Sequence, residues 1–304
     1  MAAVKQSDSL FQVARSLISK RDFIKALEVN TISEKIALEK LGRISAAYGA
    51  CCHLRGLVNY LIANYSEAEK WYTEAIEIRK KVLGKDNRDY AGSLSNLGLL
   101  YSELRNFEKA EPLCLEATSI RMKIVGNEHP EYAASLNNLA NLYRDMGNFD
   151  EAEPLYIEAK AIRMKALGTE HPDFAQSLNS LAILYSLMGY YEQAESLYLK
   201  SQVIIEKVLG KNHPDFAQSL NNLAILNMDL GKFEKSEQLY LEALNSRKII
   251  FGKENPAYAE SVLNVANLYI KMGNYEKAEL YYFEASSIFL KKSLVKSIQI
   301  MPQV

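Results

Sequence analysis

The sequence predicts an all-α solenoid built from stacked antiparallel helix pairs. The chain of 304 residues matches itself when it is shifted by 42 residues, and within each unit the apolar side chains recur at helical spacing. A fixed period between about 20 and 50 residues indicates a stacked array, because one such unit cannot bury its apolar face alone. We therefore expect a repeat array and not the two globular domains that the chain length alone would suggest.

The register of the repeat is marked by a large apolar residue followed by glycine. This pair recurs without insertion or deletion at Leu83-Gly84, Val125-Gly126, Leu167-Gly168, Leu209-Gly210 and Phe251-Gly252. We predict a degenerate N-terminal repeat or cap over residues 1–41, six repeats over residues 42–292, and a tail over residues 293–304. The six repeats span residues 42–82, 83–124, 125–166, 167–208, 209–250 and 251–292.

The unit that starts at Val125 shows how each helix pair is encoded. Pro130 suits the first turn of a helix, where its missing N–H is not needed, and the acidic Glu131 beside it complements the helix N-terminus. Gly147 ends this helix, and a second amphipathic helix starts acidic and ends basic. The pattern predicts two helices of about 15 residues in each repeat. For the whole chain we expect about 75–80% helix, far above the average of about a third.

Two prolines depart from this simple pattern. Pro112 and Pro154 lie near the start of the second helix of their repeats, where a proline can remove a hydrogen bond. The other repeats have different residues at this position, so the architecture does not require proline. We expect a slight bend or a late helix start at these two sites.

The recurring residues of the unit resemble the tetratricopeptide repeat. The resemblance is carried by Leu139, Ala140, Tyr143, Gly147, Phe149, Ala152, Tyr156 and Ala159. The longer period and the phrases HPDFAQSLNNLA and YEKAELYY resemble the kinesin light chain type of this repeat. The resemblance covers about residues 42–291. It implies a right-handed superhelix whose inner, concave surface holds extended peptides or helices, but it does not specify an activity.

Composition excludes several classes of function. There are 36 Lys and Arg against 37 Asp and Glu, so the formal net charge is −1, and we expect no nucleic-acid partner. No apolar run reaches the length of about 18 residues that would predict a membrane span. The N-terminus does not read as a secretory signal. The three cysteines have no disulfide-type spacing, which favours a reducing, cytoplasmic location.

Catalytic motifs are not found in the sequence. The glycine-rich phosphate loops, HExxH, CxxC and GxSxG are all missing, so we expect neither enzymatic activity nor a cofactor. His129, His171 and His213 each precede a proline at the same repeat position. Equivalent atoms of stacked repeats should lie about 10 Å apart, whereas zinc needs ligand atoms at about 2 Å. We therefore predict that these histidines cap helices and bind no metal.

Two further features have a functional and a structural interpretation. Cys51 and Cys52 could form a redox pair or a metal ligand set, but neighbours on a helix point about 100° apart. We interpret them as small buried residues. Trp71 aligns with leucines in later repeats, which indicates a core or inter-repeat residue and not a ligand-stacking one.

The residues of the first helices that lie off the packed stripe are candidates for partner binding. Asn and Gln recur there, and each amide offers both donors and acceptors to the backbone of an extended segment. The candidates are Asn96, Asn137, Asn138, Asn141, Arg144, Gln176, Asn179, Gln218, Asn221, Asn222, Asn264 and Asn267. Apolar positions such as Ile183, Ile225 and Ile270 would add specificity. The alternative is that these amides bond to neighbouring helices within the array.

Charge narrows the choice of partner. Arg144 is the one clear cation among the candidates, while Glu103, Asp229 and Glu260 lie on or near the same face. This disfavours the Lys and Arg clamp for a terminal carboxylate that chaperone-binding tetratricopeptide domains use. The sequence thus predicts a non-catalytic scaffold or adaptor that binds a peptide or helix of a protein partner. The alternative is an array that self-associates through its end faces, because the C-terminal segment is apolar.

Overall fold

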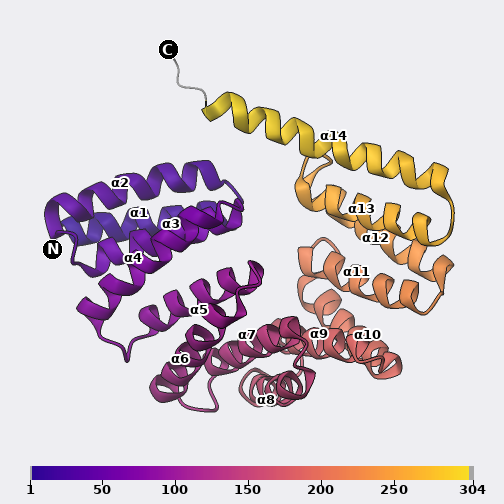
Figure 1. The fold of residues 1–304 in the computed structure, drawn as a ribbon, viewed down its shortest axis with the longest axis horizontal. Helices are drawn as coiled ribbons and strands as arrows, with labels where there is room; N and C mark the ends of the chain where they lie inside the picture. The colour runs from indigo at the N-terminus through magenta and orange to yellow at the C-terminus, as the bar shows by residue number, and fades with distance from the viewer. Residues whose placement is uncertain (1, 301–304) are drawn as a thin grey trace. The chain divides into compact units, whose positions relative to one another are not determined.

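Fourteen α-helices and no strand make up the described part of the chain, as the computed structural model shows (Figure 1). The structure describes the backbone of residues 2–300 and the side chains of residues 4–290. Helices account for 85% of the described residues, somewhat more than the sequence predicts. The all-α class is therefore confirmed.

The helices divide between two compact units, Met1–Ala166 and Leu167–Val304, and each predicted repeat contains one helix pair. The first unit contains α1 (Ala2–Ser19), α2 (Phe23–Leu41), α3 (Ala46–Leu61), α4 (Tyr65–Leu83), α5 (Arg88–Glu103), α6 (Phe107–Val125), α7 (Pro130–Met146) and α8 (Phe149–Leu167). The second contains α9 (Pro172–Leu187), α10 (Tyr191–Leu209), α11 (Pro214–Asp229), α12 (Phe233–Phe251), α13 (Pro256–Lys271) and α14 (Tyr275–Ile300). Within each unit, helices that follow one another along the chain pack together.

The second helix of each pair is longer than expected. Helices α4, α6, α8, α10 and α12 each have 19 residues, because each runs on to the apolar residue before the glycine of the register pair. There the chain turns through a positive φ, which is 79° at Gly84 and which a side chain would disfavour. The glycine therefore ends one repeat and lets the next begin.

The two unusual prolines are accommodated inside regular helices. Pro112 lies within α6 and Pro154 within α8, and both side chains are exposed. The helices start at Phe107 and Phe149, the same repeat position at which α10 starts with Tyr191. The late helix start that we expected is therefore wrong. A proline near the start of a helix removes one hydrogen bond without ending the helix.

The histidine caps are confirmed. The Nδ1 atom of His129 accepts a hydrogen bond from the backbone N–H of Glu131 at 3.1 Å. His171 and His213 accept from the second residue of α9 and α11 in the same way, at 3.1 and 3.2 Å. Each ring satisfies one of the free N–H groups at a helix N-terminus. Among the residues that the structure describes, no three His, Cys, Asp or Glu side chains gather as metal ligands.

In each helix pair, a small residue of the first helix faces the second helix and packs against a large side chain there. A Cβ atom added to Gly56 would lie 2.6 Å from Cδ1 of Tyr72, far inside van der Waals contact. In a later repeat the corresponding residues are Ala140 and Tyr156, and both are 0% exposed. The small side chain lets the two backbones approach, and the large one fills the space between repeats.

The C-terminal end is helical further than the predicted repeat extends. Helix α14 runs to Ile300 and so includes the backbone of much of the predicted tail, residues 293–304. The side chains of this tail lie outside the described residues. Over the described part of the chain, no helix combines the length and the apolar character that crossing a bilayer requires.

Candidate partner-binding face

The side chains predicted for partner binding differ in their exposure. Three are exposed, namely Gln176, Gln218 and Asn267. Those that are half-buried are Asn96, Asn138, Asn141, Arg144, Asn179 and Asn264. Three are buried, namely Asn137, Asn221 and Asn222. A partner can therefore reach some of these amides directly, whereas others are enclosed by neighbouring helices.

In the second unit, several of these amides bond to one another between successive first helices. The Nδ2 group of Asn222 donates to Oδ1 of Asn179 at 2.7 Å, and that of Asn264 donates to Oδ1 of Asn221 at 2.6 Å. Gln218 also donates to Oδ1 of Asn222 at 2.9 Å. These bonds hold α9, α11 and α13 in register, as in the alternative that the sequence left open. Each amide has more donors and acceptors than these bonds use.

In the first unit, the side-chain oxygen of the candidate Asn141 on α7 already accepts hydrogen bonds from a tyrosine and an arginine. The hydroxyl of Tyr156 donates to Oδ1 of Asn141 at 2.6 Å, and Nη1 of Arg144 lies 3.3 Å from the same oxygen. Arg144 also forms an ion pair with Asp145 at 2.7 Å. Its charge is thus neutralised within the repeat, which argues further against a clamp for a partner carboxylate.

A column of arginines on the second helices, all buried except the half-buried Arg121, was missed in the sequence. Its members are Arg79, Arg121, Arg163 and Arg247, which share one repeat position. Burial lowers the pKa of Arg79 and of Arg121 because it disfavours the charged form. The recurrence of arginine at one position, beside apolar residues, is the signal that could have revealed this column.

The guanidinium groups of Arg79, Arg121 and Arg247 donate to the first helix that follows each of them. Nη1 of Arg79 lies 2.8 Å from the carbonyl oxygen of Asp89 and 2.7 Å from Oγ of Ser93. Nη1 of Arg247 donates to the carbonyl oxygen of Ala257, at the same repeat position as Asp89, at 3.0 Å. The guanidinium thereby joins one repeat to the next.

Side chains of the preceding first helix complete the set of acceptors. Nη1 of Arg121 lies 2.8 Å from Oγ of Ser95, on the preceding first helix, and 2.9 Å from Oγ of Ser135, on the following one. Nη2 of Arg247 donates to Oε1 of Gln218 at 2.9 Å. Gln218 is one of the predicted partner-binding residues, so the column and the candidate face meet at this side chain.

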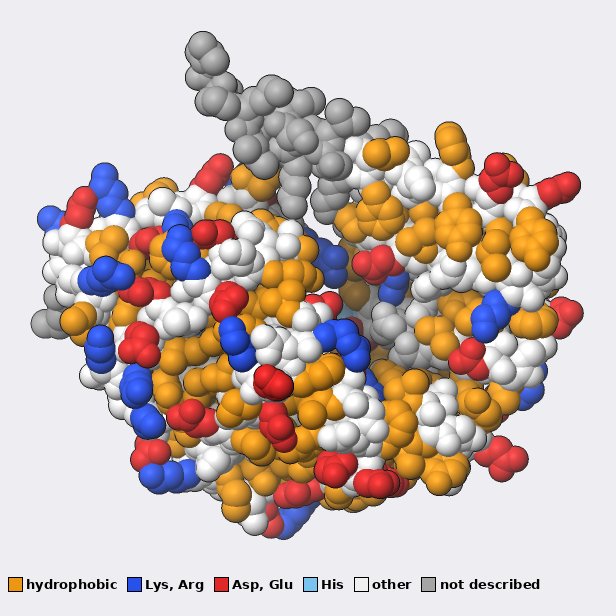
Figure 2. Space-filling view, viewed as in Figure 1, with side chains coloured by type: hydrophobic (Ala, Val, Ile, Leu, Met, Phe, Trp, Pro, Cys, Tyr) orange, Lys and Arg blue, Asp and Glu red, His pale blue; other side chains and the backbone are white. Residues whose placement is uncertain are grey.

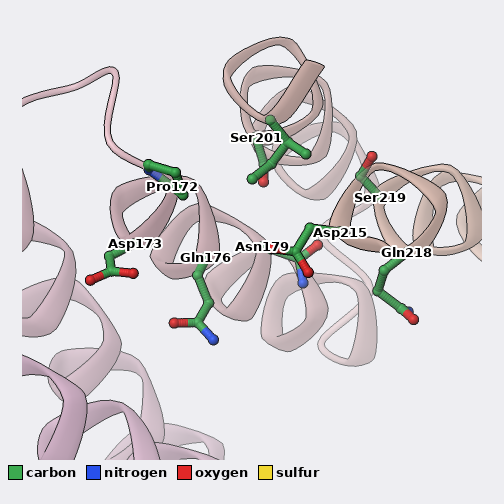
Figure 3. Close-up of a pocket in the computed structure, with 9 residues that line it drawn as sticks. Pro172, Asp173, Gln176, Asn179, Ser201, Asp215, Gln218 and Ser219 are labelled. Atoms are coloured by element: carbon green, nitrogen blue, oxygen red, sulfur yellow. The ribbon is translucent and has the colours of Figure 1, made fainter. Parts of the chain in front are cut away.

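A pocket of about 230 Å³ opens in the second unit, between α9, α10 and α11 (Figure 3). Three of its lining residues, Gln176, Asn179 and Gln218, are among the predicted candidates. Asp173, Ser201, Ile205, Asp215 and Ser219 also line it. The structure therefore gathers amides, hydroxyls and carboxylates from two successive first helices around one cavity.

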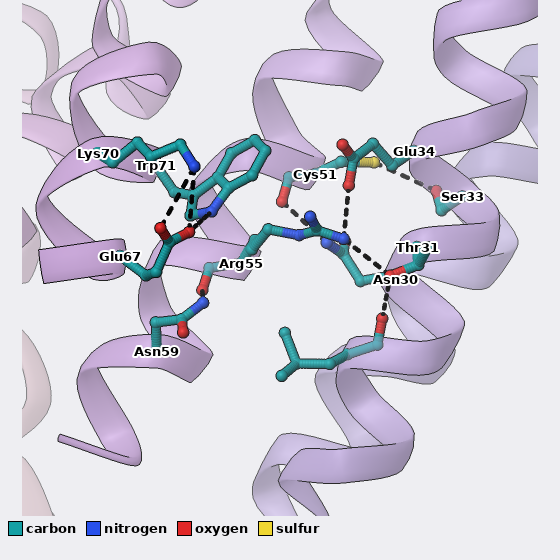
Figure 4. Close-up of polar contacts among 11 residues, drawn as sticks. Asn30, Thr31, Ser33, Glu34, Cys51, Arg55, Asn59, Glu67, Lys70 and Trp71 are labelled. Carbon is teal, nitrogen blue, oxygen red and sulfur yellow. Dashed lines mark hydrogen bonds and ion pairs between the residues drawn. The ribbon is translucent and has the colours of Figure 1, made fainter. Parts of the chain in front are cut away.

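Trp71 belongs to a packed polar cluster in the first unit (Figure 4). Its indole Nε1 donates to Oε2 of Glu67 at 2.9 Å, and the guanidinium of Arg55 lies 4.7 Å from the ring centre. Arg55 in turn donates to Oγ1 of Thr31 at 2.8 Å and pairs with Glu34 at 2.9 Å. Trp71 is partly buried against a core cluster, in line with the core or inter-repeat position expected.

The cysteines are buried, as expected. Cys51, Cys52 and Cys114 are at most 4% exposed. Burial raises the pKa of Cys52 to about 12 and that of Cys114 to about 11. Because the thiolate is the nucleophile and the metal ligand, these protonated thiols are unreactive at neutral pH. They pack in the core as small buried residues.

Charges of both signs lie next to one another on the face drawn in Figure 2, without a large area of one sign. This distribution agrees with the near-zero net charge of the chain. Helix pairs of this kind, stacked in sequence order with polar side chains on the first helices, form a repeat array.

The chain belongs to the tetratricopeptide repeat family. The family model matches residues 43–123, 89–163, 131–202, 175–227 and 215–291, which together span most of the chain. No curated protein matches the sequence at a significant level. The family is typically a non-catalytic scaffold for protein interactions.

Solved structures confirm the kinesin light chain type of the repeat and the all-α solenoid class. BtubC (BKLC) from P. vanneervenii is 22% identical, with a TM-score of 0.57 over 77% of this chain and 92% of that one. TPR-like repeats of a kinesin light chain from Podosopora anserina are 26% identical, with a TM-score of 0.55 over 66% and 95%. The apo form of RapI is 18% identical, with a TM-score of 0.66 over 95% and 99%.

Proposed function

We propose that the chain is a non-catalytic scaffold or adaptor whose first helices bind an extended peptide or a helical segment of a protein partner. One observation carries the proposal. The first helices expose polar amides such as Gln176 and Gln218 next to aliphatic side chains such as Ile225 and Ile270, which are 37% and 43% exposed.

The chemistry of this face suits a peptide backbone better than a charged group. Amides can donate and accept at once, so they pair with backbone C=O and N–H groups whatever the sequence of the peptide. Exposed isoleucines would contact apolar side chains of the same peptide. A solved Rap conjugation regulator, 12% identical with a TM-score of 0.62, is in complex with the Phr* peptide, which supports the use of this fold for such a ligand.

Exposed side chains of the second unit provide the test of this proposal. A triple variant with Gln176→Ala, Ile225→Ala and Ile270→Ala should lose binding of the native partner by about tenfold or more, since the loss of about 1.4 kcal/mol suffices for that. Partners are captured from native lysate, identified by mass spectrometry and titrated as purified proteins. Asn137 and Asn221 are left intact because they are buried, so that their replacement would also affect stability.

The matched control places the same kind of change on the second helices. Leu199→Ala, Leu241→Ala and Ile249→Ala remove exposed aliphatic side chains from α10 and α12. This variant should bind as the wild type does. Loss of binding in the control, with binding retained in the first-helix variant, would place the partner on the opposite helices and refute the proposal.

Self-association is a second candidate function, favoured by the surface of α14. Leu280, Phe283 and Leu290 follow helical spacing and are 71%, 77% and 63% exposed. This candidate predicts a concentration-dependent dimer in sedimentation equilibrium, and a monomer for the Leu280→Ser, Phe283→Ser variant. A wild-type chain that stays monomeric at about 100 μM, a concentration at which weak specific dimers form, would exclude it.

A further inference from the structure

The pocket of the second unit lies where the column of arginines is interrupted. The repeat position that holds Arg79, Arg121 and Arg247 holds Ile205 in helix α10. Ile205 is 5% exposed and lines the pocket. An isoleucine is shorter than an arginine and carries no donor, so the volume that a guanidinium fills in other repeats is left open here.

Acceptors that hold the guanidinium in other repeats are kept around this opening. The guanidinium of Arg79 donates to the carbonyl oxygen of Asp89 and the hydroxyl of Ser93. Three repeats later these two positions are Asp215 and Ser219, and both line the pocket. The site thus retains the groups that accept hydrogen bonds although the internal donor is replaced.

The side-chain acceptors of the preceding first helix are retained as well. Ser95, which accepts from the column in the first unit, corresponds to Asn179. Gln218, which accepts from Arg247, corresponds to Gln176 one repeat earlier. Asn179 and Gln176 both line the pocket, and both offer an amide oxygen. Each position that accepts a hydrogen bond from Arg79, Arg121 or Arg247 therefore has an oxygen-bearing counterpart here.

We propose that this pocket binds the guanidinium group of an arginine side chain supplied by the peptide partner. The proposal rests on the proposed function, and it names the residue that the peptide would anchor. Asp173 and Asp215 also line the pocket, and their carboxylates, which lie 3.9 and 3.7 Å from Nδ1 of the capping histidines, add negative charge near it that favours a cation. The planar fork of guanidinium donors matches several oxygens at once, whereas an ammonium group offers a single point of charge.

The pocket also has the size of one side chain. Its volume of about 230 Å³ is below the range of about 300–1,000 Å³ typical of sites for whole small molecules. Ile205 presents an aliphatic surface against which the methylene stem of an arginine can pack. The opening therefore suits a single anchoring residue of a longer chain.

A small probe tests the site without the native partner. N-acetyl-arginine methylamide is titrated into isotope-labelled protein, and the side-chain amide signals of Gln176, Asn179 and Gln218 are followed by NMR. We expect saturable shifts with a millimolar Kd. The isosteric but neutral citrulline derivative should shift these signals at least tenfold less. Equal shifts with the citrulline derivative would overturn the proposal. So would the absence of any shift when the concentration of the arginine derivative is 20-fold above a millimolar Kd.

Restoring the internal arginine provides an independent test. The Ile205→Arg variant should place its own guanidinium in the pocket, keep its Tm within about 2 °C of the wild type or raise it, and lose probe binding. The matched control is Val203→Arg on the same helix. Val203 is 63% exposed, so this substitution adds the same charge outside the pocket. This control should bind the probe normally. Retained probe binding in a folded Ile205→Arg protein would contradict the assignment.

A third variant covers the case in which Ile205→Arg fails to fold. Gln176→Leu removes an acceptor from an exposed side chain, and it should weaken probe binding at least fivefold without changing the Tm. Unchanged binding in this variant would also count against the site. Since none of these measurements uses the native partner, a negative result would reject the arginine site alone, whereas failure of the capture experiment would reject the proposed function.

Discussion

Replacement of Tyr156 by alanine is expected to lower the free energy of unfolding by about 3–5 kcal/mol, the range measured for large aromatic side chains removed from cores. Tyr156 is 0% exposed and fills the space opposite Ala140. Its hydroxyl also donates to Asn141 at 2.6 Å, so truncation leaves both a cavity and a lost hydrogen bond. Urea denaturation followed by circular dichroism measures the change.

The same substitution at the equivalent position of the last repeat is the matched control. Tyr282 also donates to an asparagine, Asn267, but it is 36% exposed. Tyr282→Ala should cost about 1–2 kcal/mol less than Tyr156→Ala, since about a third of Tyr282 already lies in solvent. Equal losses in the two variants would show that the repeat position, and not the burial, decides the cost.

Acidification from pH 7 to pH 5 is expected to cost the first unit about 2 kcal/mol through His53, at 1.36 kcal/mol for each pH unit below the unfolded pKa. Burial, and then the charges of Arg79 and Arg15, lower the pKa of His53 to about 3. The unfolded chain therefore binds a proton near pH 6.5 that the folded chain does not. The stability is present above pH 6.5 and is lost progressively as the pH falls towards 3.

The His53→Asn variant isolates this contribution from that of other groups. Asparagine is the residue that Asn137, Asn179 and Asn221 provide at the same repeat position. The wild type and the variant are unfolded in urea at pH 7 and pH 5. We expect the variant to lose about 2 kcal/mol less than the wild type between the two pH values. An identical pH dependence would refute the role of His53.

Local chemistry made most of the fold predictable from the sequence. A His-Pro step caps and starts a helix within three residues, and the glycine of each register pair ends one, so helix positions depend on near neighbours. Small residues such as Ala140, opposite Tyr156, identified the faces that pack. The late start at Pro112 was wrong because the remaining hydrogen bonds and the packing of α6 outweigh one missing N–H.

The candidate site was predicted in part. The sequence pointed to Gln176, Asn179 and Gln218, and these three line one pocket. It did not show that Asn222 is buried and bonded to Asn179, because that bond joins residues of different repeats. It also missed the arginine column, since a charged residue on a helix reads as solvent-exposed until the neighbouring helices that bury it are known.

Repetition and capping alone therefore settle that this chain forms consecutive helix pairs and where the first helix of each pair begins. Tertiary packing decides the rest. Tyr156 and Tyr282 occupy one repeat position, yet only Tyr156 is fully enclosed. Likewise, the change from arginine to Ile205 is a single letter in the sequence, but it opens a pocket because the acceptors that surround it come from two other helices.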